Sequence, residues 1–224
     1  MADAIKKIDR AALKSVAKGK LKGNWGWAVS LTLVSAVILG IFDSFPAFFT
    51  VSEDNSVNIA AMGSGAFGTI LSGLITAGIA YTYLSFADQG EKGNIFSGIF
   101  AGFTHGRFIP TLLNTFLTAF FTSMWTLLLI IPGIIKSYSY AMAPYIMKDL
   151  LDAGKEPEPT EAITKSRELM NGHKWELFVF DLSFMGWNLL ACLTLGIGFL
   201  WVLPYYNAAH AGFYRALAGE RFKS

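Results

Sequence analysis

The stretch IAAMGSGAFGTILSGLITAGIAYTYLSF, residues 59–86, decides the fold class, because it contains no charged residue. A helix needs about 20 apolar residues to cross the hydrocarbon core of a bilayer, which is about 30 Å thick. This stretch is long enough to cross with a tilt or to include a turn at the interface. It predicts an all-α, polytopic membrane protein.

Five other apolar stretches complete a predicted bundle of about six transmembrane helices. The turn between the third and fourth of the six has two alternative places. We prefer a turn at residues 123–125, with Pro132 bending the fourth helix, because Pro204 lies at a comparable place in the sixth. The alternative is a turn at Pro132 and Gly133 themselves. The five further stretches are residues 25–42, 108–123, 126–147, 175–192 and 195–214.

The composition excludes an ordinary soluble domain. Hydrophobic residues make up 53% of the chain and charged residues only 15%, whereas soluble domains carry about 25% charged residues. The chain is therefore predicted to form one integral membrane domain over residues 1–224. A net charge of +2 is too small to indicate nucleic acid as a partner. Cys192 is the only cysteine, which excludes an internal disulfide and a cysteine-based zinc cluster.

The distribution of basic residues predicts the orientation. All of them except Lys136 fall on one side of the six-span order. The loop between the first two spans has three acidic residues and no basic one. Because cytoplasmic loops carry an excess of Lys and Arg, we expect a multi-pass protein of the plasma membrane with both termini in the cytoplasm. The expected cytoplasmic segments are residues 1–23, 88–107, 148–174 and 215–224.

Tryptophan side chains give a second prediction of depth, because they gather at the two membrane interfaces. In the six-span order, Trp25, Trp27 and Trp175 are expected at the inner interface. Trp125 and Trp201 are expected near the outer one.

Three of the cytoplasmic segments each read as an amphipathic helix followed by a glycine and then a span. Such helices lie in the headgroup plane with their apolar face toward the lipid. The pattern predicts three units, each an interfacial helix plus a two-span hairpin; the alternative is three ordinary connecting helices. The lipid bilayer is the expected partner. Anionic headgroups would contact the basic residues Lys6, Lys7, Lys14, Lys18, Lys165, Arg167 and Lys174.

Small residues recur at every fourth position in the second span, at Ser64, Gly68, Ser72 and Thr76. Faces of small residues let helix backbones approach closely in lipid. We interpret this stripe as a helix-packing surface. The functional alternative is a pore or a seam between two copies of the chain.

Polar residues at membrane depth are costly there and are often functional. Six of them are candidates for an intramembrane polar site. They either hydrogen-bond between helices, with the lysine reaching the surface, or line a polar cavity in which the aspartate and the lysine are candidate partners. The six are Asp181, Lys136, Asn188, Asn207, His210 and Asn114.

The sequence contains no recognisable catalytic or metal-binding pattern. Its three histidines are far apart and fit no paired-ligand spacing. No phosphate-binding loop, dinucleotide fingerprint or nucleophile elbow occurs. We therefore expect no catalytic residues, no metal and no cofactor.

Four segments are similar to a known family. They are IPGIIKSYSYAMAPYIMKD at residues 131–149, EAITKSRELMNGHKWELF at 161–178, LSFMGWNLL at 182–190 and GIGFLWVLPYYNAAHAGFYRAL at 196–217. Through them the chain resembles the bacterial domain-of-unknown-function family 975. That resemblance implies a bacterial plasma-membrane protein with no established activity and no catalytic residues. A more distant similarity, to the membrane domain of some glycerophosphodiester phosphodiesterases, rests on the pattern Ala162, Ser166, Leu169 and Gly172.

Three functions remain open at this point. The leading hypothesis is a non-catalytic scaffold or accessory component of the cell envelope. The alternative is a transporter of small molecules or lipids, or a lipid-handling protein, with a polar cavity between spans 4, 5 and 6. A third possibility, a membrane enzyme, requires polar groups that converge near the inner interface, for example His173, Glu176 and Asp181. The sequence does not decide between a protein partner and a second copy of the chain.

Overall fold

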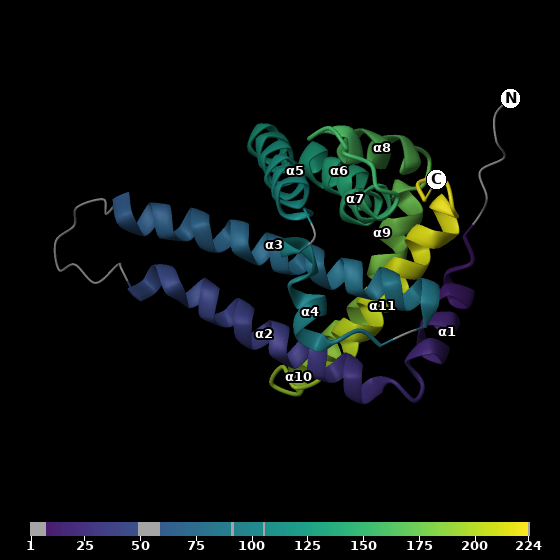
Figure 1. Ribbon diagram of the computed structural model, residues 1–224. Coiled ribbons are helices and arrows are strands. Elements are labelled where there is room, and N and C mark those ends of the chain that lie inside the picture. The colour runs from purple at the N-terminus through teal and green to yellow at the C-terminus, as the bar shows by residue number, and fades with distance from the viewer. Residues whose placement is uncertain (1–7, 49–58, 91, 105, 224) are drawn as a thin grey trace, which may run out of the picture.

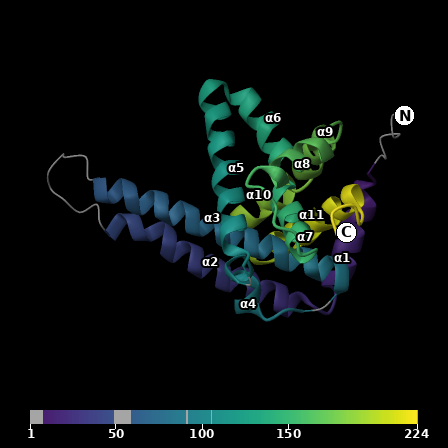
Figure 2. The same ribbon diagram turned by 45° about the horizontal axis from the view of Figure 1, so that its top comes forward.

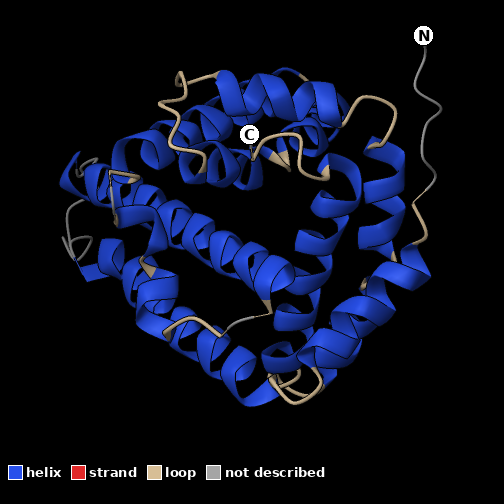
Figure 3. Cartoon of the chain, turned by 45° about the vertical axis from the view of Figure 1, so that its right-hand side comes forward, coloured by secondary structure: helices blue, strands red, loops and turns tan. Residues whose placement is uncertain are grey.

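A computed structural model describes residues 8–48, 59–90, 92–104 and 106–223 of the chain. Within these residues every regular element is a helix, as Figure 3 shows. The all-α prediction is therefore confirmed.

The elements follow one another along the chain in the order drawn in Figure 1. Two long helices, α2 and α3, lie side by side and extend away from the other helices. The elements are α1 (Arg10–Leu21), α2 (Trp25–Phe48), α3 (Ile59–Gln89), α4 (Ile95–Ile99), the 3-10 turn η1 (Ala101–Phe103), α5 (Phe108–Leu128), α6 (Ile130–Tyr140), α7 (Ala143–Asp152), α8 (Glu161–Leu169), α9 (Lys174–Leu182), α10 (Met185–Leu193) and α11 (Phe199–Ala218).

Helices α1 and α2 meet at a sharp elbow of 95°. The Asp9 side chain caps α1 by accepting hydrogen bonds from the backbone amides of Ala11 and Ala12, at 2.9 and 3.1 Å. After α1 the chain turns at Gly23, whose φ of +85° favours glycine. The elbow places α1 roughly at right angles to the long hairpin.

The base of the α2–α3 hairpin is fixed by Trp27. Its ring lies 5.0 Å from the ring of Phe86 and 5.9 Å from that of Tyr83. Its indole nitrogen donates a hydrogen bond to the Gly93 carbonyl at 2.8 Å. The start of α2 and the end of α3 therefore lie together.

The short elements α4 and η1 pack closely on α3 through glycines. A Cβ at Gly78 would overlap the backbone of Ile99, and one at Gly98 would overlap the side chain of Thr82. The Thr82 hydroxyl donates a hydrogen bond to the Gly98 carbonyl at 2.9 Å. The segment expected as an interfacial helix is thus a short helix and a turn held against α3.

The turn between α5 and α6 corrects the preferred prediction. α5 continues through residues 123–125 to Leu128, and Leu129 is extended, with φ −158° and ψ 132°. The reason is Pro132, whose ring would clash with the Leu128 carbonyl if the helix continued. Pro132 instead lies in the first turn of α6, where its missing N–H needs no partner. The predicted fourth span is then interrupted again between α6 and α7.

Fewer helices than expected meet the length and apolarity needed to cross a membrane. Three do so among the described residues: Gly68–Gln89, Phe108–Leu128 and Lys174–Leu193. A fourth is reached if the bent pair α1 and α2 counts as one span. The shortfall from six arises because α6 and α7 have only 11 and 10 residues, and because α11 mixes polar residues into its apolar sequence.

The core and the exposed surface are both rich in large apolar side chains. Buried aromatic residues from α3, α9 and α11, such as Tyr81, Phe180 and Tyr214, belong to the main core cluster. Yet Leu127, near the end of α5, is 88% exposed, and Leu195, after α10, is 96% exposed. Exposed apolar surface of this kind indicates contact with lipid or another apolar partner.

Candidate functional site

A cavity of about 660 Å³ lies between α2, α3, α5 and α11, with Ala141, Pro144 and Tyr145 on the wall near the start of α7. Figure 2 shows how α5 rises from α3 beside the long hairpin. This volume falls within the range of small-molecule sites, roughly 300–1,000 Å³. The cavity is the candidate functional site.

Two residues of α5 that line the cavity each carry a polar atom without a hydrogen-bond partner among the described residues. They are Oδ1 of Asn114 and Oγ1 of Thr118, both buried. Asn114 is only 2% exposed. Leaving a buried polar group unpaired costs roughly 1–3 kcal/mol. The α5 wall of the cavity therefore carries two unpaired polar atoms beneath its surface.

Three hydroxyls in the α2 and α3 walls of the cavity are satisfied by their own helices. Thr32 donates to the Ala28 carbonyl at 3.0 Å, and Ser35 donates to the Leu31 carbonyl at 2.7 Å. Thr76 donates to the Ser72 carbonyl at 2.8 Å. Hydroxyls often bond back in this way within apolar surroundings. These hydroxyls of α2 and α3 therefore differ from the unpaired Thr118 hydroxyl on α5.

The position of α5 follows from two contacts with α3. The Tyr81 hydroxyl and Thr111 Oγ1 lie 3.0 Å apart in a buried hydrogen bond. A Cβ at Gly73 would overlap the Thr115 side chain, so only glycine permits this approach. Asn114 and Thr118, one turn apart on the same side of α5, consequently face the cavity.

Three of the six predicted polar residues line this cavity: Asn114, Asn207 and His210. A fourth, Asp181, lies directly behind one of them, because its Oδ1 is 2.6 Å from Nε2 of His210. This pair joins α9 to α11. The cavity therefore lies mainly on α2, α3, α5 and α11, whereas sequence reasoning placed it between the fourth, fifth and sixth spans.

The remaining two predicted polar residues lie elsewhere. The Lys136 ammonium is 4.7 Å from the centre of the Trp125 ring, within the α5–α6 hairpin. Asn188 is exposed on α10. Asp181 thus pairs with His210 and not with Lys136.

The small-residue stripe on α3 is only partly in view. The side-chain surroundings of Ser64 fall outside what the structure describes; Gly68 is buried, and Thr76 is exposed beside the cavity. The closest helix approaches in this region are made by Gly73 and Gly78, which lie off the stripe.

Several basic residues predicted to contact headgroups have other partners. Lys14 donates to the Ser183 carbonyl at 3.1 Å, and Lys165 lies 2.5 Å from Glu161. Lys18 and Arg167 are exposed, and Lys174 is half-buried. Lys6 and Lys7 lie outside the described residues.

The predicted depth of one tryptophan is wrong. Trp25 and Trp201 line the same small cavity of about 240 Å³, together with Trp187. They therefore cannot lie at opposite faces of a bilayer core about 30 Å thick. The turn between α10 and α11 is close to the α1–α2 elbow.

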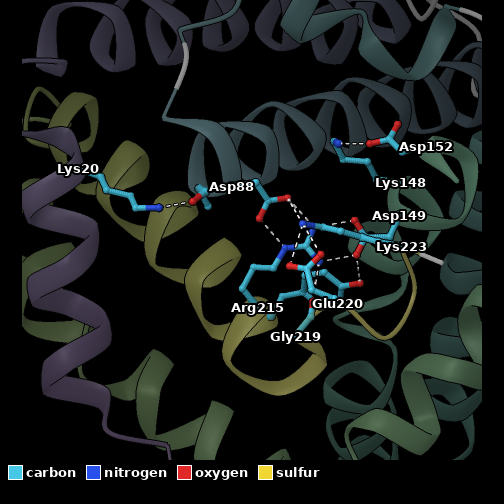
Figure 4. Close-up of polar contacts among 11 residues, drawn as sticks. Lys20, Asp88, Lys148, Asp149, Asp152, Arg215, Gly219, Glu220 and Lys223 are labelled. Carbon is cyan, nitrogen blue, oxygen red and sulfur yellow. Dashed lines mark hydrogen bonds and ion pairs between the residues drawn. The ribbon is translucent and has the colours of Figure 1, made fainter.

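An ion-pair cluster that sequence reasoning missed ties three elements together, as Figure 4 shows. Arg215 donates to both oxygens of Asp88, at 2.6 and 2.7 Å. It also donates to both oxygens of Asp149, at 2.7 and 2.6 Å. Burial opposes the charge on Arg215, but these carboxylates raise its pKa above the ordinary value. The Tyr214 hydroxyl adds a hydrogen bond to Asp149 at 2.7 Å.

Two of the three residues named for a possible membrane enzyme pair with each other, and the third has another partner. His173 Nδ1 lies 2.8 Å from Glu176 Oε2, while Asp181 is engaged by His210. Among the described residues, no group of three or more His, Cys, Asp or Glu side chains could hold a metal ion.

Comparisons with known proteins identify a family but no characterised relative. The family model described as "Protein of unknown function (DUF975)" matches residues 8–136 and 126–221. No curated protein and no solved structure matches the chain. The distant similarity to the phosphodiesterase membrane domain therefore stays a prediction. Because the family matches cover nearly the whole chain, the protein belongs to the DUF975 family, for which no function is known.

Proposed function

We propose that the protein is a multi-pass protein of the cell membrane that binds a membrane-soluble small molecule or lipid in the cavity and catalyses no reaction. The cavity carries this proposal, because it has the size of a ligand site and Asn114, Asn207 and His210 line it. A polar-lined cavity favours a lipid-handling protein or transporter over a scaffold with a fully packed interior.

The proposed membrane arrangement begins with α1 at the cytoplasmic surface. The 95° elbow lets α1 lie in the headgroup plane while α2 crosses. The 24 residues of α2 reach about 36 Å, which is enough to span the core. The α2–α3 hairpin then crosses twice, and α3 ends beside the Arg215 cluster at the cytoplasmic side.

The other two hairpins of the six-span order have apolar ends. Residues 127–131 at the α5–α6 turn are all Leu or Ile, and all are exposed. At the α10–α11 turn, Leu193, Leu195 and Ile197 are exposed too. Exposing so many apolar side chains to water is unfavourable. We therefore place both turns within the lipid, the α10–α11 turn near its cytoplasmic side because it lies close to the α1–α2 elbow. Both hairpins then enter the membrane from the cytoplasmic side.

The absence of a catalytic role is part of the proposal. The polar groups in the cavity are amides, hydroxyls and one histidine, His210, which is held by Asp181. A general acid or base must reach a reacting group and have a pKa suited to the task. The amides and hydroxyls of the lining can supply hydrogen bonds and no such proton transfer.

Native mass spectrometry of the purified protein tests the function. The protein is released from a mild detergent, and bound molecules are read as added mass. We expect at least one bound lipid or small molecule in the wild type, lost in Ala119→Trp, which fills the exposed side of the cavity. Leu127→Trp places the same side chain on the exposed end of α5 and is the control.

Equal amounts of bound molecule in the wild type and in both variants would overturn the proposal. A scaffold role would then become the better account.

A further inference from the structure

We propose that the protein binds a phosphate group in a second, smaller pocket near the end of α3. This phosphate pocket has a volume of about 170 Å³ and lies between α3, the loop and short helix α4 that follow it, and α7. It shares no lining residue with the cavity of the proposed function. The inference therefore stands whether or not that cavity holds a ligand.

The wall of the phosphate pocket carries two basic side chains and, among the described residues, no carboxylate. They are Arg107, just before α5, and Lys148 of α7. Both pair with Asp152 behind the wall: Arg107 Nη2 lies 2.5 Å from its Oδ1. The Lys148 ammonium donates to its Oδ2, as Figure 4 shows. One carboxylate cannot neutralise two cations, so the three side chains carry a surplus positive charge.

The surplus charge is costly because Lys148 is deeply buried. Only 7% of its side chain is exposed. Its ammonium has three N–H donors, and Asp152 is their one acceptor among the described residues. A buried charge is stable only when it is paired and hydrogen-bonded. Arg107 is more accessible, with 24% of its side chain exposed. A bound anion can therefore contact Arg107 and neutralise the surplus charge.

Uncharged donors line the same pocket. Ser85 is half-buried and Ser97 is exposed, and neither hydroxyl donates a hydrogen bond to another described residue. Asn94 Oδ1 accepts from two backbone amides at 3.0 and 3.4 Å, which leaves its amide nitrogen as a donor. The Thr82 hydroxyl, by contrast, is engaged with the Gly98 carbonyl. The accessible polar groups of the pocket are thus mainly donors.

The size and the donors of the pocket fit a phosphate group. About 170 Å³ is less than the roughly 300–1,000 Å³ of drug-sized sites, so the pocket admits a small ion or a headgroup and not a lipid body. A phosphate monoester has a charge of about −1.5 to −2 and three strong acceptor oxygens, whereas a carboxylate has two oxygens. Arg and Lys are the side chains that most often bind phosphate. Donors from several separate segments can each reach a different phosphate oxygen.

The phosphate group has two possible sources. On the proposed membrane arrangement α3 ends at the cytoplasmic side, and residues 88–107 and 148–174 are expected cytoplasmic segments. The pocket is then open to free phosphate from the water. Phe96, next to Ser97, is an aromatic side chain that is 61% exposed. The pocket therefore also suits the phosphate headgroup of a lipid whose chains stay in the bilayer.

Two matched comparisons test the inference on the full chain in an uncharged detergent. Calorimetric titration compares inorganic phosphate with acetate at the same ionic strength. Native mass spectrometry compares oleoyl lysophosphatidic acid with monoolein, which differ only in the phosphate group. We expect the phosphate compound of at least one pair to bind at least about 10-fold more tightly, the gain from roughly one hydrogen bond to a charged group.

Variants shift the surplus charge in both directions. Lys148→Gln and Arg107→Gln each leave one cation paired with Asp152, and each should weaken phosphate binding at least about 10-fold. Asp152→Asn leaves both cations unpaired and should tighten binding, which the loss of a merely structural contact would not do. Ser85→Ala keeps all the charges and should weaken binding less. Arg221→Gln, at an exposed position, is the control and should bind as the wild type does.

The outcomes identify the source or overturn the inference. Binding of inorganic phosphate that is lost in Lys148→Gln supports a free anion. Binding of lysophosphatidic acid alone, lost in the same variant, supports a lipid headgroup. If Lys148→Gln does not fold, Arg107→Gln and Asp152→Asn decide. The inference is overturned if neither phosphate compound binds more tightly than its partner, or if binding is unchanged in the glutamine variants at 107 and 148.

Discussion

Arg215 donates hydrogen bonds from two nitrogens to the carboxylate of Asp88, which lies 127 positions earlier in the sequence. This contact joins the end of α11 to the end of α3. The same guanidinium holds Asp149 of α7, whose side chain is 1% exposed. Both acceptors are carboxylates, and a planar guanidinium satisfies two of them with parallel hydrogen bonds. This arrangement fixes three helices at one end of the molecule.

Arg215→Ala should strongly destabilise the protein, because it leaves Asp149 buried without its partner. Breaking a buried ion pair costs roughly 3–5 kcal/mol. Arg215→Lys keeps the positive charge but cannot donate to both carboxylates with a planar guanidinium, so its loss of stability should be smaller than that of Arg215→Ala. Thermal unfolding in detergent measures both, with Arg221→Lys at an exposed position as the control. An unchanged unfolding temperature in Arg215→Ala would show that the cluster is not stabilising.

Asn114→Leu should stabilise the ligand-free protein, although it removes a polar side chain. The substitution ends the cost of an unpaired Oδ1, which is roughly 1–3 kcal/mol. For a chain of this size that is a rise of about 2–4 °C in the unfolding temperature per kcal/mol. The measurement is thermal unfolding after delipidation. Asn188→Leu should change little, and a fall in stability for Asn114→Leu contradicts an unpaired group.

Asp181→Ala should destabilise the packing of α9 on α11. The variant removes the acceptor 2.6 Å from His210 Nε2 and leaves that ring nitrogen without its bond. Asp181→Asn keeps a hydrogen-bonding side chain at the same place and should be milder. Thermal unfolding in detergent, compared with Glu168→Ala at an exposed position, gives the result. Equal effects of Asp181→Ala and Asp181→Asn would mean that the hydrogen bond contributes little.

Cysteines at the two apolar turns should resist water-soluble reagents. In a Cys192→Ala background, Leu129→Cys and Leu195→Cys are expected to react poorly with a membrane-impermeant maleimide, in intact cells and in inverted vesicles alike. Both positions are exposed in the protein, so only lipid protects them. Glu156→Cys, in the expected cytoplasmic segment, should react in inverted vesicles alone. Fast labelling of either turn in intact cells would place it in the outer water.

Acid should weaken α8 through one ion pair. A hydrogen bond from Lys165 holds the pKa of Glu161 below its ordinary value. A carboxyl whose pKa falls on folding stabilises the folded state above the unfolded pKa, and this stabilisation is lost as the pH falls through the folded pKa. The pair lies on one helix face, so the effect is about 0.2–0.5 kcal/mol. Unfolding of wild type and Glu161→Gln, followed from neutral pH down to acid, should converge at low pH.

The helical class and the family could be predicted, because long uncharged stretches have few other folds open to them. The α5–α6 turn was misplaced for a local reason. Residues 123–125 contain no residue that ends a helix. Pro132 does end one, because its ring clashes with the carbonyl of Leu128, four residues earlier in the chain. The preferred prediction gave Pro132 only a bend within the fourth span, whereas Pro132 causes the turn between α5 and α6.

The cavity could be predicted only in part. Asn114, Asn207 and His210 were found as polar residues at membrane depth, but Thr118 was not. The sequence does indicate Thr118, because threonines recur along α5 at the spacing of one helix face. They are Thr111, Thr115, Thr118 and Thr122. The Arg215 cluster had no local signal, because its two carboxylates come from distant segments and pair only after folding.

The Arg215 cluster and the ligand cavity share no residue. Substitutions at separate sites usually add without coupling, so the lining of the cavity can diverge while the cluster keeps the helices in place. Lineages that carry this fold can therefore evolve new ligand preferences by a few changes on α5, with the stability of the framework inherited unchanged.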